Sequence, residues 1–370
     1  MSPPSMSPPG TVVVKIGSST VTAPSGDLDQ AVVGSLCAEL AALVADGHRV
    51  VVVTSGAIAC GWAALGRHGP RPTDPAVLQA LSAVGQHRLV LGWQEGLGAH
   101  GLLAGQVLLA PLDLGHRRQY LHARGTLQHL WNLGVVPVVN ENDAVADEEI
   151  RFGDNDRLSA LVAHLVHADL LVLLTDAPGL LTADPRIAEG SLIEEVVEID
   201  QRLVEMAGGP GEAGSGGMAS KLAAARIATW SGVATVIADG RRPGVVRAAL
   251  SGEAGIGTVC RPRPGRLPAR KLWIAFALGA SGLLTVDEGA REALTSGRRS
   301  LLPAGVTATQ GRYQPDDAVE IAGPGGAVFA KGLVRYASDR AAEWLGRRTD
   351  ALPGDLPPEI VHRDDLVVLV

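Results

Sequence analysis

The sequence predicts an α/β protein: a mostly parallel central sheet with helices on both faces, followed by a small, mainly β domain. Short apolar runs typical of buried strands alternate with helix candidates over roughly 250 residues. The composition fits a tightly packed core of this kind, with 46% hydrophobic residues, 46 Gly and only 3% aromatic residues. After Cys260 the chain becomes rich in Pro and Arg, then continues with short strand candidates and one helix-like segment at 339–345.

At 370 residues the chain exceeds one typical domain, so we expect two. The first residues, MSPPSMSPPG, are polar and Pro-rich, and predict a disordered tail at 1–10. A larger domain is predicted for 11–262, a linker for 263–270 and the smaller domain for 271–370. Because the tail lacks an apolar signal segment, we expect a cytoplasmic protein.

Charge and cysteine usage exclude several classes of protein. The formal net charge of −7 argues against a general nucleic-acid or anionic-membrane binder. No apolar run approaches the roughly 20 residues of a membrane-spanning helix, so we expect no membrane partner. Cys37, Cys60 and Cys260 have neither metal-site nor disulfide spacing, and we expect reduced thiols in the core.

The first strand candidate, residues 11–17, is apolar except for Lys15. A lysine there is costly unless it has an anionic partner, although it could instead extend to the edge of the sheet. A helix is expected at 28–46 and a strand at 49–54, which ends in the small residues Ser55 and Gly56, where the backbone can approach a ligand closely.

The remaining elements of the larger domain follow from the same patterns. Further strands are expected at 102–109, 135–139, 170–174, 233–238 and 257–260, and helices at 121–132, 158–166 and 222–230.

A polar stretch between the strand at 135–139 and the helix at 158–166 contains four Asp, three Glu and three Asn. The helix is predicted to begin near Asp156, and its amino end favours anions. The acids of the loop also suit a ligand that carries an ammonium group or Mg²⁺. Capping explains one polar residue at the helix start, but not the cluster Asn140, Glu141, Asn142 and Asp143 at a strand end, where open α/β sheets place their ligands.

Residues 208–217, GGPGEAGSGG, form a Gly-rich segment that leads through Met218, Ala219, Ser220 and Lys221 into a helix. Three of its glycines match G-x-G-x-x-G by spacing, but no strand precedes them, so we reject a dinucleotide site. The segment is better interpreted as a phosphate cradle, with a flexible linker as the alternative. The chain has no G-x-x-x-x-G-K-[ST] motif of Walker-type ATPases.

Taken together, two lysines, several carboxylates and mobile Gly backbone at one edge of a sheet suit phosphoryl transfer. Lys15 and Lys221 would neutralise the transferring group, Mg²⁺ would bridge nucleotide phosphates, and the acids would hold the substrate and orient the lysines. The sequence shows no Ser-His-Asp set and no cluster of metal-ligating histidines.

Seven motifs, spread in order from about Thr11 to Asp365, resemble the glutamate 5-kinase family of proline biosynthesis. They are VVVKIGSS, VVVVTSGAI, PVVNENDAVA, FGDNDRLSALVA, LLTDAPGLLTADPR, GSGGMASK and VHRDD. The resemblance implies the αβα sandwich of amino acid kinases with a carboxy-terminal PUA domain. It also implies ATP-dependent phosphorylation of the side-chain carboxylate of L-glutamate to L-glutamyl 5-phosphate, with Mg²⁺, feedback inhibition by proline and a homo-oligomer. A carboxylate is already ionised near pH 7, so this reaction needs no general base.

The resemblance also assigns residues. Lys15 and Lys221 are expected to contact the transferring phosphate, and Asp156 to organise both lysines. Glutamate binding is expected of Ser55, Asp143 and Asn155, with Gly56, Asn140 and Asp154 in support. The nucleotide site is expected to include Lys15, Thr175, Asp176, Ser215, Gly216, Gly217, Met218, Ala219, Ser220 and Lys221. The chain departs from the family pattern in opening this last run with Ser215 rather than Thr, after an elongated Gly-rich segment.

Two alternatives remain open. A sibling amino acid kinase would act on another carboxylate, such as that of N-acetylglutamate or aspartate, but acids near Asp143 favour a substrate with a free ammonium group. An RNA-binding regulator would use the second domain, where residues 263–370 carry 14 Lys and Arg against 13 Asp and Glu. Because this is no broad basic face, we expect a structural or regulatory role there and no RNA binding.

Overall fold

The computed structural model describes residues 9–67, 69–70, 72–110, 114, 117–145, 155–183, 190–207, 217–276, 278–297, 299–348 and 357–369. The chain divides into two compact units, Met1–Arg266 and Leu267–Val370. Of the predicted tail at 1–10, residues 1–8 lie outside the described residues. None of the helices in the described ranges combines the length and apolar character that crossing a membrane requires.

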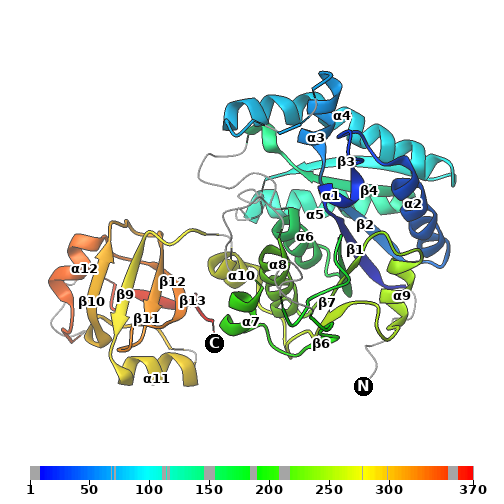
Figure 1. The fold of residues 1–370 in the computed structure, drawn as a ribbon. Coiled ribbons are helices and arrows are strands. Elements are labelled where there is room, and N and C mark those ends of the chain that lie inside the picture. Colours follow the sequence, from blue (N-terminus) through cyan, green and yellow to red (C-terminus); the bar gives the residue numbers. More distant parts are fainter. Residues whose placement is uncertain are drawn as a thin grey trace. The chain divides into compact units, whose positions relative to one another are not determined.

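Within the described residues, eight strands form the sheet of the first unit in the order β3-β4-β2-β1-β5-β7-β8-β6 (Figure 1). They are β1 Thr11–Ile16, β2 Arg49–Thr54, β3 Leu103–Leu109, β4 Val135–Glu141, β5 Leu170–Thr175, β6 Glu195–Val196, β7 Ala234–Asp239 and β8 Thr258–Cys260. All paired neighbours run parallel except β7 and β8. The mostly parallel sheet predicted from the sequence is confirmed.

Helices cover both faces of this sheet (Figure 1). The helices of this unit are α1 Ser18–Val21, α2 Gln30–Ala45, α3 Ala57–Ala64, α4 Pro75–Gly98, α5 Arg117–Asn132, α6 Asn155–Leu165, α7 Gln201–Met206, α8 Met218–Trp230 and α9 Val245–Ser251, with a 3-10 turn η2 at Asp143–Val145. One face packs against α2, α4 and α9 in a single apolar core. The other contacts α5, α6 and α8. Strands β1 and β5 are buried at every position, as parallel strands covered on both sides must be.

The sequence analysis missed the helices α3 and α4, which follow β2. They pack backbone against backbone: a Cβ added at Gly85 would lie 1.8 Å from the carbonyl oxygen of Ala57, and one at Gly61 would lie 2.0 Å from that of Leu81. Glycines in a sequence normally suggest loops, whereas here they let two helices touch.

The second unit is built on a five-stranded sheet in the order β10-β9-β11-β12-β13 within the described residues. Its elements are α10 Ala269–Phe276, β9 Gly282–Val286, α11 Glu288–Ser296, η3 Pro303–Gly305, β10 Val306–Gly311, β11 Ala318–Ala322, β12 Val328–Val334, α12 Ser338–Trp344 and β13 Val361–Val368. The pairs are antiparallel except β9 with β11. The mainly β character is confirmed; helices α10 and α11 were not predicted.

Candidate active site

One cavity lies at the carboxyl ends of β1, β2, β4 and β5, because parallel strands finish at the same edge of the sheet. Its lining residues are Lys15, Gly17, Ser18, Ser19, Ser55, Gly56, Ala57, Ile58, Ala59, Asn140, Asp143, Asn155, Leu174, Thr175 and Lys221. The cavity therefore brings together residues from strand ends and from the first turns of α3, α6 and α8, and Lys15, Ser55, Gly56, Asn140, Asp143, Asn155, Thr175 and Lys221 among them are predicted site residues.

Asp156 joins two lysines that come from distant parts of the chain. Its Oδ1 lies 2.6 Å from Nζ of Lys15 at the end of β1, and its Oδ2 lies 3.4 Å from Nζ of Lys221 on α8. The hydroxyl of Ser220 also donates to Oδ2 over 3.1 Å. All three charged side chains are at most 4% exposed. With two positive charges and one negative, the group keeps a net positive charge that an anion can use.

Burial and charge act in opposite directions on this group. Burial alone would raise the pKa of Asp156, but the charges of Lys15 and Lys221 outweigh it and lower that pKa below its ordinary value. Burial lowers the pKa of Lys221, an effect that the Asp156 carboxylate counteracts and the nearby Lys15 charge reinforces. Asp156 therefore stays ionised and tied to both lysines.

Toward β4, which lies two places from β1 in the sheet, the cavity is lined by an acidic residue. Asp143 on η2 is buried, and one of its oxygens, Oδ2, accepts a hydrogen bond of 2.9 Å from Ser82 Oγ on α4. Its other oxygen, Oδ1, is buried and has no hydrogen-bond partner among the described residues. Burial raises the pKa of Asp143 and the Ser82 hydrogen bond lowers it. A buried, half-satisfied carboxylate of this kind is well suited to receive an ammonium group.

Asn140, at the end of β4, is held in the same way. Its Nδ2 donates to Oε1 of Gln86 on α4 over 2.7 Å, and its own Oδ1 is buried with no partner in the part of the chain that the structure describes. Asn155, the first residue of α6, accepts a hydrogen bond of 3.1 Å from the backbone N–H of Glu141. Helix α4 thus supports two predicted substrate residues through Ser82 and Gln86, neither of which the sequence analysis identified.

The backbone conformation of residue 56 explains why a glycine occupies this position in the cavity wall. It stands before α3 with φ of 113°, a left-handed conformation that favours glycine. A Cβ there would approach side-chain atoms of Val21 and Thr22 to 3.3 Å. Its neighbour Ser55 also lines the cavity.

The residues predicted to bind the nucleotide divide into two groups. Thr175, at the end of β5, lines the cavity and donates to Oδ1 of the exposed Asp176 over 3.2 Å. Gly217 precedes α8, and Met218, Ala219 and Ser220 form its half-buried first turn. Of the other predicted residues, Asp154, Ser215 and Gly216 lie outside the described residues. Gly17, Ser18 and Ser19 line the cavity but were not predicted; their position directly after Lys15 was the available signal.

Comparisons with known proteins identify the family of each part of the chain. The model of the amino acid kinase family matches residues 10–239, and that of the PUA domain matches residues 282–353. "Glutamate 5-kinase" of Gloeobacter violaceus is 48% identical over 368 residues, covering 97% of this chain and 99% of that protein. The protein of the same name from Rhodococcus opacus is 46% identical over 360 residues, covering 97% of each.

Proposed function

The chain belongs to the glutamate 5-kinase family, and from this premise we propose that it transfers the γ-phosphoryl group of ATP to the side-chain carboxylate of L-glutamate, the first step of proline biosynthesis from glutamate. The membership confirms the resemblance predicted from the motifs, as well as the amino acid kinase and PUA domains. The product is L-glutamyl 5-phosphate, and ATP is the co-substrate that a kinase requires.

The observation that carries this proposal is the polarity of the cavity. Lys15 and Lys221, held by Asp156, form a cationic side for phosphate groups. Toward β4, Asp143 and Asn140 present buried oxygens without a partner among the described residues, suited to the ammonium group of an amino acid. An acceptor that carries both an ammonium and a carboxylate group can then be oriented between these two sides.

In the proposed reaction, an oxygen of the glutamate side-chain carboxylate attacks the γ-phosphorus. A new P–O bond forms while the bond to the β–γ bridging oxygen breaks, and ADP leaves with that electron pair. The two lysines stabilise the charge on the transferring group and the leaving oxygen. No residue needs to remove a proton, because the attacking carboxylate is ionised.

We propose Mg²⁺ as the counterion of the nucleotide. Asp156 does not fit as its ligand, because each of its oxygens already contacts a lysine. Asp176 fits better: its carboxylate is exposed, stands directly after the cavity residue Thr175, and offers the hard oxygen that Mg²⁺ prefers. The ion would neutralise phosphate charge, while phosphates and waters supply its remaining ligands.

Hydroxamate formation with ATP and Mg²⁺ tests the substrate, because hydroxylamine traps acyl phosphates. L-glutamate, L-aspartate and N-acetyl-L-glutamate are compared in parallel. We expect activity with glutamate alone, since acylation removes the ammonium group that Asp143 would bind. Activity only with N-acetyl-L-glutamate or aspartate would favour a sibling amino acid kinase and overturn the substrate assignment.

We also propose that proline inhibits the enzyme by occupying the acidic side of the cavity. Proline carries the same ammonium and α-carboxylate groups as glutamate, but it has no side-chain carboxylate to phosphorylate. Inhibition should therefore be competitive with glutamate and weakened by the Asp143→Asn substitution. Inhibition that glutamate cannot relieve would place the proline site elsewhere.

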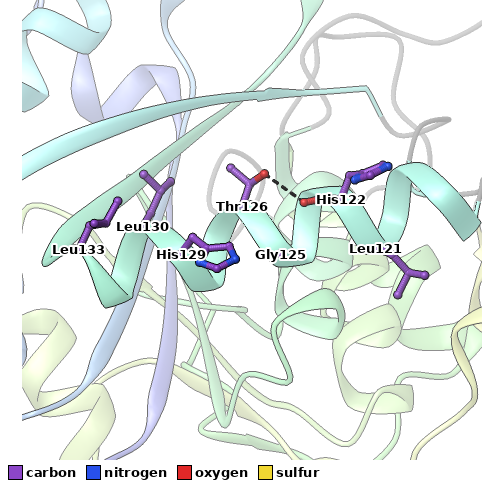
Figure 2. Close-up of a pocket in the computed structure, with 7 residues that line it drawn as sticks. All are labelled: Leu121, His122, Gly125, Thr126, His129, Leu130 and Leu133. Carbon is purple, nitrogen blue, oxygen red and sulfur yellow. Dashed lines mark hydrogen bonds between the residues drawn. The ribbon is translucent and has the colours of Figure 1, made fainter.

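A homo-oligomer is proposed from an apolar face beside the edge strand β3. Leu103 of β3 is 59% exposed and Leu133 at the end of α5 is 75% exposed. Figure 2 shows the residues that line a pocket along α5, from Leu121 to Leu133. Because α5 packs close to β3 through Leu130 and Gly105, helix and strand form one surface that a second copy could cover.

Light scattering after size exclusion tests this surface. We expect Leu133→Glu to reduce the molar mass of the wild-type oligomer, whereas Val197→Glu, a matched substitution at another exposed position, should leave it unchanged. A wild-type protein that is monomeric at micromolar concentration would refute the oligomer.

We further propose that the enzyme acts in the cytoplasm, and that the second unit has a structural or regulatory role.

A further inference from the structure

A second group of basic side chains lies at the carboxyl end of α6. This basic cluster consists of Tyr120 and Arg124 on α5, His164 and His167 at the end of α6, and Arg266 after β8. The ring centroids of Tyr120 and His164 are 6.3 Å apart, and those of His164 and His167 are 6.4 Å apart. Arg266 hydrogen-bonds to His167 Nδ1 and, over 2.6 Å, to the backbone oxygen of Ser231.

The charges in the basic cluster are all positive. Among the described residues, neither Arg124 nor Arg266 forms an ion pair with a carboxylate. Burial lowers the pKa of His164 to about 4, and the charges of Arg266, His167 and Arg124 act in the same direction. Burial, Arg266 and Arg124 likewise lower the pKa of His167. This uncompensated charge contrasts with the lysines of the catalytic cavity, which share Asp156.

The hydrogen bonds show which nitrogen of His167 carries its proton and which nitrogen of His164 is left unpaired. Arg266 can only donate, so Nδ1 of His167 must accept and its proton lies on Nε2. His164 is 4% exposed, and its Nδ1 has no hydrogen-bond partner among the residues that the structure describes. Native proteins rarely leave a buried polar atom unpaired, so this nitrogen calls for a partner that those residues do not supply.

The favourable interaction of a cation with the carboxyl end of a helix explains the position of one member of the basic cluster, Arg266. Arg266 donates to a carbonyl at the end of α8, and cations are favoured at the carboxyl ends of helices. This reason does not extend to Arg124, which lies within α5, or to the neutral, buried His164. One arginine and one unpaired imidazole nitrogen therefore remain without a structural explanation.

We propose that the basic cluster is a second anion site, separate from the catalytic cavity, which takes a small molecule bearing a phosphate or carboxylate group. Arg124 and Arg266 supply the charge, and the imidazole of His164 supplies a buried hydrogen bond. Tyr120 provides a hydroxyl on the same side. The site stands eight residues from Asp156 along α6, about 12 Å at the rise of an α-helix, so one helix links the two anion sites.

Histidine-selective NMR of the full chain tests the proposal, with inorganic phosphate and acetate as probes at constant ionic strength in chloride. The Lys221→Ala background weakens phosphate binding in the catalytic cavity. We expect the His164 and His167 resonances, assigned through His→Gln variants, to shift and saturate with phosphate, acetate or both. Arg124→Gln should weaken that binding about tenfold or more, as expected for loss of a charged hydrogen-bond partner.

Arg247→Gln serves as the matched control, because Arg247 is exposed and pairs with Asp46 on another part of the unit. It should bind the probes as the background protein does. If Arg124→Gln fails to fold, the same measurement on Arg266→Gln gives the comparison. Histidine resonances that shift linearly without saturating, or an unchanged affinity in the folded arginine variant, would overturn the second site.

Discussion

The two sides of the catalytic cavity differ in how their charges are balanced before any ligand binds. On the cationic side, Asp156 already contacts both lysines. On the acidic side, Asp143 has one satisfied oxygen and one buried oxygen without a partner among the described residues. The first arrangement is complete in the free protein, whereas the second would be completed by the proposed substrate contact. Substitutions on the two sides should therefore affect turnover and substrate binding differently.

Asp156→Asn should have the largest effect, because it leaves two buried lysines without their shared carboxylate. We expect turnover to fall by a factor on the order of 1,000 and the free energy of unfolding to fall by about 3–5 kcal/mol, as for other broken buried ion pairs. A coupled ADP assay and denaturant unfolding measure these quantities. Asp46→Asn, in an exposed pair with Arg247, is the control and should change neither. Near-normal turnover would remove Asp156 from its organising role.

Lys221→Ala tests the cationic side with one charge removed. Turnover should fall about 100-fold, because the lysine stabilises charge that develops during transfer. The KM for glutamate should change little, since this side chain belongs to the phosphate side. Steady-state kinetics at saturating ATP separate the two parameters, and Lys271→Ala in the second unit is the matched control. An effect on KM alone would assign Lys221 to binding.

Asp143→Asn should produce the opposite pattern. Replacing the carboxylate by an amide of similar shape removes the negative charge that faces the ammonium group of glutamate. We expect the KM for glutamate to rise about 10- to 100-fold, the range for a hydrogen bond to a charged group, with a smaller change in turnover. Normal saturation by glutamate would contradict the proposed contact.

Ser82→Ala should have the smallest effect, and it is visible mainly in the pH dependence. Asp143 binds an ammonium group only when ionised, and burial has already raised its pKa. The Ser82 hydrogen bond lowers that pKa, so its loss should raise it further. The acid limb of kcat/KM for glutamate should move to higher pH by up to about one unit, while activity at pH 8 stays close to normal.

Ser251→Ala is the control for this measurement, because Ser251 bonds only within its own helix α9. Its pH profile should superimpose on that of the wild type. A Ser82→Ala profile that moves to lower pH, or not at all, would show that Ser82 does not tune the Asp143 carboxylate.

Elements that are buried on both faces could be predicted from the sequence, whereas helices that pack through glycines could not. Strands β1, β2 and β5 could be predicted because continuous apolar runs are typical of strands covered on both faces. Lys15 and Asp143 could be identified because a charged residue at the end of an apolar strand is costly unless it has a partner or a ligand. Both were brought into one cavity.

Helices α3 and α4 could not be predicted in the same way. Gly61 and Gly85 allow the two backbones to touch, so glycines stand at buried positions where helix prediction expects larger apolar side chains. Ser82 and Gln86 were missed with α4, although they support Asp143 and Asn140. No local pattern links residues 61 positions apart, as Ser82 and Asp143 are.

The contact between Asp156 and Lys221 also affects whether the reaction product can acylate the enzyme. An acyl phosphate is an acylating agent, and a neutral lysine amine is a nucleophile that it can modify. Burial lowers the pKa of Lys221 and so favours that neutral amine, whereas the Asp156 carboxylate opposes the change. A protonated lysine has no lone pair with which to attack. By keeping Lys221 charged, Asp156 would protect the enzyme from covalent self-inactivation by the product that, in the proposed mechanism, the same lysine helps to form.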